Sequence, residues 1–186
     1  EGTPYSVSDD ASILVKTSGT TVEAVGFFGN KTEIVFPANV NKIGASFADG
    51  SPDLVKVTIP AVTNFGASTF ANCPKLTTAV YAAEATTTGN NTFQNCTALT
   101  DVTLPTAITQ LGSNLFNGCT ALKTVTIPDG VTKINSGVFR NSGIEEITLP
   151  ASLTEIVADL FNGCKSLKNI TIPASVKKIN NNAFKD

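Results

Sequence analysis

The sequence predicts a solenoid, a chain wound into similar turns that stack along one axis. Two residue types recur at a fixed period of about 23 residues, which is typical of repeat architectures. The phenylalanines on one phase are Phe47, Phe70, Phe93, Phe116, Phe139, Phe161 and Phe184, and only the step from Phe139 to Phe161 is one residue shorter than the others. The prolines on the same beat are Pro37, Pro60, Pro105, Pro128, Pro150 and Pro173. Between these markers a strand-like pattern recurs.

Each repeat predicts one short strand. The stretch Val125-Thr126-Ile127 alternates apolar and polar residues, so one face of it is expected to point inward. Pro128 ends the strand because proline has no backbone N–H, and Val131 and Ile134 point inward again after a bend. Turns stacked at ~4.8 Å place these strands side by side in a parallel sheet. Seven strands are predicted, near 34–36, 57–59, 78–81, 102–104, 125–127, 147–149 and 170–172.

The repeat pattern resembles the BspA-like leucine-rich repeats of bacterial cell-surface proteins. It reads Cys-x-x-Leu-x-x-Val-x-Ile-Pro, followed by Val-x-x-Ile and a phenylalanine. The residues that carry it in one repeat are Cys119, Leu122, Val125, Ile127, Pro128, Val131, Ile134 and Phe139. The resemblance covers roughly 31–186 and implies a right-handed leucine-rich repeat solenoid with a concave parallel β-sheet and little helix. It also implies an exported adhesion or protein-interaction module, and it brings no catalytic residues.

Residues 1–30 do not follow the repeat. Tyr5–Val7, Ile13–Val15 and Val22–Phe27 predict strands, which we interpret as an N-terminal β cap because the first turn of a solenoid must have its open core covered. The solenoid then spans 31–186, and the two parts form a single structural domain. The chain begins at Glu1 and contains no methionine, so we expect that a secretory signal was removed.

Composition excludes several classes of function. The 186 residues carry a net charge of −2, which provides no basic face for nucleic acid. The chain has no histidine, so catalytic devices and metal sites that need imidazole are ruled out. No apolar run approaches the ~18 residues of a membrane helix. We therefore expect no enzyme activity, no cofactor and no membrane-spanning segment.

The four cysteines share one repeat phase. They are Cys73, Cys96, Cys119 and Cys164, and Ser142 takes the remaining position. Four cysteines in an exported protein suggest two disulfides, but side chains stacked on one phase point the same way and cannot meet. Four ligands in a row also cannot form the tetrahedron that zinc requires. We predict buried, reduced thiols.

The outward-facing strand positions form columns rich in threonine, which are the candidate binding surface. Threonine suits exposed strands, so the columns have a purely structural interpretation beside the functional one. We expect a monomer, exported to the cell surface or the extracellular space, that binds a protein partner, such as a host or extracellular matrix protein, through its concave face. The alternative is a carbohydrate-binding surface protein. The candidate residues are Lys56, Thr58, Thr78, Asp101, Thr103, Lys123, Thr124, Thr126, Glu145, Glu146, Thr148, Asn169 and Thr171.

Two further features have competing interpretations. The turn 82–93 has Ala85 and Thr88 where other turns have larger apolar residues, so we expect it to be the least stable turn or a mobile contact loop. The adjacent acids Glu145 and Glu146 could suggest glycoside chemistry, and so could the pair at residues 9–10. That chemistry needs two carboxylates facing each other across a cleft, so we predict solvated acids at both places.

Overall fold

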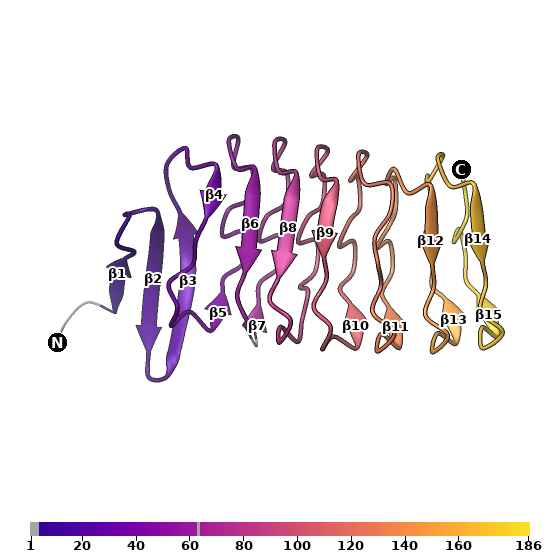
Figure 1. Ribbon diagram of the computed structural model, residues 1–186, viewed down its shortest axis with the longest axis horizontal. Coiled ribbons are helices and arrows are strands. Elements are labelled where there is room, and N and C mark those ends of the chain that lie inside the picture. Colours follow the sequence, from indigo (N-terminus) through magenta and orange to yellow (C-terminus); the bar gives the residue numbers. More distant parts are fainter. Residues whose placement is uncertain (1–3, 63) are drawn as a thin grey trace.

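A computed structural model describes residues 4–62 and 64–186, and it shows a solenoid of parallel β turns (Figure 1). The turns stack along the long axis, with an N-terminal antiparallel segment at one end and β14 and β15 at the other. None of the described residues is helical. The strands are β1 Tyr5–Val7, β2 Ile13–Ser18, β3 Thr21–Phe27, β4 Glu33–Ile34, β5 Lys42–Ile43, β6 Lys56–Ile59, β7 Asn64–Phe65, β8 Thr78–Tyr81, β9 Asp101–Thr103, β10 Gln110–Leu111, β11 Lys133–Ile134, β12 Glu146–Thr148, β13 Glu155–Ile156, β14 Asn169–Thr171 and β15 Lys178–Ile179.

One row of strands, the front ladder, contains most of the strands that the sequence predicts. It consists of β4, β6, β8 and β9, then residues 124–127, then β12 and β14. In β6, Lys56 and Thr58 are exposed while Val57 and Ile59 are buried, so the alternation places apolar residues in the core as expected. Six of the seven predicted strands are confirmed, each beginning at the predicted residue or one residue earlier.

The predicted strand at 125–127 is wrong. Among the described residues, 124–127 make no backbone hydrogen bond to either neighbour, although their side chains still alternate between exposed and buried. Repeat length does not explain this. Residues 124–126 lie 23 residues after β9 and 22 residues before β12, and both spacings occur between paired strands elsewhere, 23 between β8 and β9 and 22 between β6 and β8. The Glu145 N–H donates to the carbonyl of Lys123, just as the Thr77 N–H donates to that of Val55 ahead of the paired strands β6 and β8.

A second row of strands, the back ladder, was not predicted from the sequence. It contains β5 and β7, then β10 and β11, then β13 and β15, all paired in parallel. Each of these strands has two residues, too few for a periodic pattern to identify. The sequence pattern showed only that Val131 and Ile134 point inward, and both are buried.

The N-terminal residues join the back ladder directly. β1, β2 and β3 form an antiparallel sheet, and β3 then pairs in parallel with β5. The three predicted N-terminal strands are confirmed in position. The role of residues 1–30 as a cap stays a prediction.

The two ladders are interrupted at the same place along the axis. β11 does not pair with β13, just as 124–127 do not pair with β12. We call this junction, between the turn at 116–134 and the turn at 139–156, the seam. Outside the two ladders, the corner of the turn that contains Phe116 and Gly118 stays hydrogen-bonded across the seam. The Phe116 N–H donates to the carbonyl of Val138 at 2.9 Å, and the Gly118 N–H donates to that of Arg140 at 2.8 Å.

A column of phenylalanine rings fills the core. Phe93 and Phe116 stack with centroids 6.0 Å apart and an interplanar angle of 5°, and the stack runs from Phe70 to Phe184 with spacings of 5.5–6.0 Å. Phe47 meets Phe70 edge to face instead. The predicted ladder of buried rings is confirmed from Phe70 to Phe161, and Phe184 continues the stack as a partly exposed ring.

The cysteines are free and buried, as predicted. Each thiol donates a hydrogen bond to a carbonyl of the preceding turn, as Cys96 does to Phe70 at 3.0 Å and Cys164 to Phe139 at 2.8 Å. Burial raises the pKa of the Cys119 thiol to about 12. The position of the repeat that the cysteines share therefore holds a small side chain that can donate a hydrogen bond. In one turn that side chain is the hydroxyl-bearing Ser142.

The divergent turn 82–93 contains a buried polar cluster. Thr88 and Thr92 are buried. The carbonyl of Thr88 accepts from the Tyr81 hydroxyl at 3.0 Å and from the Thr92 hydroxyl at 2.6 Å, while the Thr88 hydroxyl accepts from the Gly112 N–H at 3.0 Å. Hydrogen bonding thus satisfies the polar residues that replace apolar ones. The low stability expected of this turn stays a prediction.

Replacing Phe116 by alanine should lower the free energy of unfolding by about 3–5 kcal/mol, because rigid neighbouring turns keep the cavity from collapsing. Phe184→Ala is the matched control, since that ring lies at the end of the stack and is 39% exposed. Chemical denaturation of both variants checks this. Equal losses for the two would contradict the buried-ladder account.

Thiol labelling should separate the native and unfolded protein. We expect the four cysteines to react with a disulfide reagent only after unfolding, because all four are buried out of reach of the reagent. Titration in guanidinium should count four thiols. A count of two or none would show that disulfides form.

Candidate functional site

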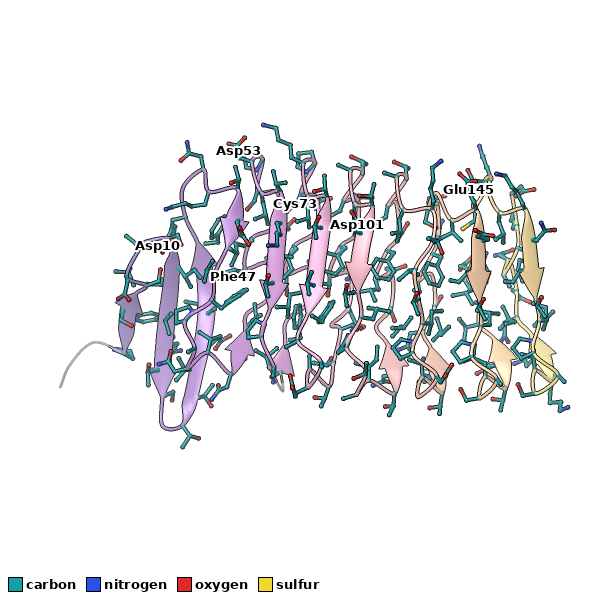
Figure 2. All side chains as sticks on the ribbon, in the orientation of Figure 1. Asp10, Phe47, Asp53, Cys73, Asp101 and Glu145 are labelled. Carbon is teal, nitrogen blue, oxygen red and sulfur yellow. The ribbon has the colours of Figure 1, made fainter. Side chains whose placement is uncertain are left out.

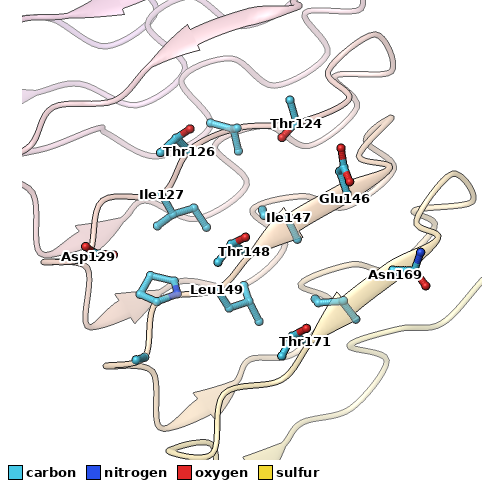
Figure 3. Close-up of a pocket in the computed structure, with 14 residues that line it drawn as sticks. Thr124, Thr126, Ile127, Asp129, Glu146, Ile147, Thr148, Leu149, Asn169 and Thr171 are labelled. Atoms are coloured by element: carbon cyan, nitrogen blue, oxygen red, sulfur yellow. The ribbon is translucent and has the colours of Figure 1, made fainter.

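A groove opens on the front ladder at the seam (Figure 3). It has a volume of about 890 Å³, within the range of ligand sites in proteins. We call it the seam groove. Its lining comes from three consecutive turns: Thr124, Val125, Thr126, Ile127, Asp129, Glu146, Ile147, Thr148, Leu149, Pro150, Ala151, Asn169, Ile170 and Thr171.

The floor of the groove is apolar and partly accessible. Val125 and Ile127 are 6% and 7% exposed, whereas Val57 and Ile59, their counterparts in the paired strand β6, are fully buried. Ile147 and Leu149, across the groove, are 7% and 5% exposed, so the floor consists of buried core residues that present only a small area to the groove.

The rim of the groove is polar. Exposed hydroxyl groups from neighbouring turns lie along the groove, as Figure 3 shows. They belong to Thr124, Thr126, Thr148 and Thr171. The charged lining residues, Asp129 and Glu146, are both acidic, and within the described chain neither forms a salt bridge. The groove therefore offers hydroxyl groups and negative charge above an apolar floor.

An ion-pair triad spans the seam beside the groove. Glu145 lies 2.8 Å from the Lys123 Nζ and 2.6 Å from the Lys168 Nζ, so one carboxylate joins three turns. Hydrogen bonding to Lys123 first, and then to Lys168, lowers the pKa of Glu145 to about 2. The same contact with Glu145 raises the pKa of Lys168. The triad neutralises Glu145, while Glu146 faces the groove and interacts with Lys168 only through the weaker electrostatic attraction that also raises the pKa of that lysine.

The structure brings together about half of the candidate residues that the sequence predicts. The residues gathered in the seam groove are Thr124, Thr126, Glu146, Thr148, Asn169 and Thr171. Lys123 and Glu145 lie beside it in the triad. The remaining candidates lie on β6, β8 and β9, outside the groove, and Figure 2 shows Asp101 and Glu145 on separate turns. They are Lys56, Thr58, Thr78, Asp101 and Thr103.

Sequence analysis missed Asp129 and the accessible apolar floor of the groove. Asp129 follows Pro128 in a turn, where a charged residue is ordinary. The shorter step from Phe139 to Phe161 does not mark the groove, because β6 and β8 pair across the same 22-residue spacing.

The adjacent acids do not form a catalytic pair. Asp10 accepts from the hydroxyls of Ser12 and Ser8, which hold the pKa of its carboxyl well below its usual range, and Lys31 lies 3.7 Å away. Glu145 is engaged by lysines while Glu146 lines the groove. Residues 4–62 and 64–186 hold no group of three or more acidic or cysteine side chains arranged for a metal ion, and no helix in these ranges has the length and apolar character to cross a membrane.

The pKa of Glu145 should be measurable by following its carboxyl carbon by NMR. A pKa lowered from 4.5 to about 2 means that the ion pairs contribute to stability above pH 4.5, and that this contribution is lost as the pH falls through 2. Replacing Lys123 and Lys168 by alanine should return the midpoint towards 4.5. Lys75→Ala, which removes a remote ion pair with Asp53, should leave it unchanged. A wild-type midpoint near 4.5 would contradict the triad.

Solved structures with the same fold come from bacteria. A leucine-rich repeat protein from Bacteroides ovatus is 30% identical, with a TM-score of 0.84, and the alignment covers 94% of this chain and 49% of that one. A leucine rich cell surface protein from Faecalibacterium prausnitzii is 26% identical, with a TM-score of 0.61, and the alignment covers 90% and 39%. A leucine-rich repeat protein from T. pallidum has the same fold at 22% identity, with a TM-score of 0.74. The alignment covers 94% of this chain and 81% of that one. The chain thus spans half or less of the first two proteins.

The sequence profile that matches is the BspA type leucine rich repeat region, in six copies, over residues 20–144 and 86–186. No curated protein matches the chain. Leucine-rich repeat folds generally serve as protein-interaction or surface modules. The two matched ranges together cover residues 20–186. The chain belongs to the BspA-type leucine-rich repeat family.

Proposed function

We propose that this chain is a non-catalytic protein-interaction module that binds a protein partner through the front ladder, with the seam groove at the centre of the contact. The observation that carries the proposal is the groove itself, where exposed hydroxyls and carboxylates surround accessible apolar side chains. A polar rim around an apolar centre is the usual composition of a protein interface. The walls belong to stacked turns that are already ordered, so binding costs little conformational entropy.

A location outside the cell supports the same proposal. The Faecalibacterium prausnitzii protein, which shares the fold, is described as a cell surface protein. We propose that this chain is likewise exported and acts at the cell surface or in the extracellular space as a monomer. Its partner would then be a protein found there, such as a host or matrix protein.

Carbohydrate binding has less support. Sugar sites commonly use aromatic side chains as stacking platforms, and none of the residues that line the seam groove is aromatic. The hydroxyls of the lining could donate hydrogen bonds to a sugar, and the carboxylates could accept them. The apolar floor would not contribute to this hydrogen bonding. The protein-interaction role is therefore favoured.

The proposal can be tested with a panel of immobilised extracellular matrix proteins and a glycan array. The variant Thr124→Arg, Thr126→Arg, Glu146→Arg should abolish protein binding, because bulky cations would fill the groove and reverse its charge. The free energy of unfolding should change by no more than ~1 kcal/mol, since all three residues are exposed.

A matched control is available on the back ladder. Thr109→Arg, Gln110→Arg, Glu155→Arg changes the same net charge at three exposed positions. We expect this control to bind like the wild type. Binding that survives the front-ladder variant, or that is lost equally in both variants, would refute the proposal, and binding on the glycan array alone would favour the alternative.

A further inference from the structure

We infer that the seam groove binds an extended peptide segment bearing lysine or arginine, by adding a strand to the unpaired backbone of residues 124–127. The inference rests on the proposed function and specifies the chemistry of the partner. Three features of the groove carry it: the state of its backbone groups, the nature of its floor, and the sign of its charge.

The backbone of 124–127 can form strand pairing that it lacks within the chain. β6, at the equivalent position, pairs with β4 on one edge and β8 on the other. Residues 124–127 have the same alternation of exposed and buried side chains, but within the described chain their N–H and C=O groups have no hydrogen-bond partner. Backbone polar groups are almost always paired when they are sheltered from water. Addition of a peptide strand to unpaired groups is an established way for proteins to bind extended peptides.

The floor and rim match the two faces of such a strand. Successive side chains of an extended peptide point to opposite sides. One set would reach the accessible apolar residues Val125, Ile127, Ile147 and Leu149. The other set would lie among the hydroxyls of the rim, with Thr126 and Thr148 on either side. The groove therefore favours a peptide that alternates apolar and polar residues.

The charge of the groove selects a cationic peptide. Figure 3 shows Glu146 and Asp129 towards opposite ends of the groove. Both lack a salt bridge within the described residues, and the lining includes no lysine or arginine. Glu146 has the register of residue 124, and Asp129 lies in the turn that follows Pro128, so the two carboxylates flank the unpaired segment. Two cations separated by about five residues can therefore each meet one carboxylate.

Fluorescence anisotropy with three labelled peptides tests the inference directly. The probe is Lys-Val-Thr-Val-Thr-Val-Lys, and the first comparison peptide has glutamate in place of both lysines. The second keeps the lysines but carries N-methyl groups on the central residues, which removes backbone donors and leaves the side chains unchanged. We expect the probe to bind at least tenfold more tightly than either comparison peptide. Equal binding of the lysine and glutamate peptides, or of the N-methylated peptide, would overturn the inference.

The acidic residues are tested by conservative variants. Asp129→Asn combined with Glu146→Gln should reduce the preference for lysine over glutamate peptides by at least tenfold, while the thermal midpoint stays within a few degrees, since both residues are exposed and form no salt bridge. Glu155→Gln, on the back ladder, is the control and should leave the preference unchanged. An unchanged preference in the double variant would show that the groove does not select charge.

Proline substitution tests the backbone. Thr126→Pro removes an N–H that has no partner in the described chain, so the fold should tolerate it while peptide binding is lost. Thr58→Pro removes an N–H from a strand paired on both edges and should lower the thermal midpoint sharply. Equal destabilisation by the two prolines would show that 124–127 are paired like an ordinary strand, which would refute the inference.

The peptide experiment and the panel experiment fail independently. If the front-ladder arginine variant loses a protein partner while the wild type binds no peptide, the chain is an interaction module that does not use strand addition, and the inference is wrong. If the peptide binds as expected while no protein of the panel does, the inference is supported and the choice of partner class is wrong.

Discussion

The whole structure depends on keeping one period from turn to turn. Stacked phenylalanine rings 5.5–6.0 Å apart, thiols that donate to the carbonyl of the preceding turn, and parallel strand pairs all require equivalent residues to lie at the same height in successive turns. Each interaction is modest alone, and together they align because the period is shared. Strand pairing tolerates a one-residue difference in spacing, since β5 and β7, like β6 and β8, pair across 22 residues while β8 and β9 pair across 23.

The seam shows which interactions persist where strand pairing is lost. The rings Phe116 and Phe139 remain stacked at 5.9 Å across the seam, and the corner hydrogen bonds beside them persist. The strand pairs of both ladders are lost instead. Aromatic packing in the core tolerates small shifts along the chain, whereas a parallel ladder needs N–H and C=O groups in register. The groove lies where the front ladder is unpaired.

The repeat alone predicts much of this fold, because a constant period specifies which residues stack. The buried rings, the reduced thiols and six front-ladder strands all follow from it. The seam does not follow, because Val125-Thr126-Ile127 has the same local pattern as a paired strand, and its spacings to both neighbouring strands also occur between paired strands. The polar cluster of Thr88 was also missed, since its hydrogen-bond partners lie on neighbouring turns. Six groove residues were among the predicted binding residues, because alternation along the strands indicates which side chains are exposed. No local feature of the sequence indicates at which turns the groove lies.

The seam also determines how the solenoid would respond to mechanical load. Tension along the axis is shared among the backbone hydrogen bonds that join neighbouring turns, and a solenoid yields where these are fewest. At the seam, the corner beside Phe116, the bonds made by Gly143 and Glu145, and the ion pair of Glu145 with Lys123 remain, while both ladders are open. A strand bound there would bridge the gap on one side, so a ligand would strengthen the chain at the point where pulling would otherwise part it.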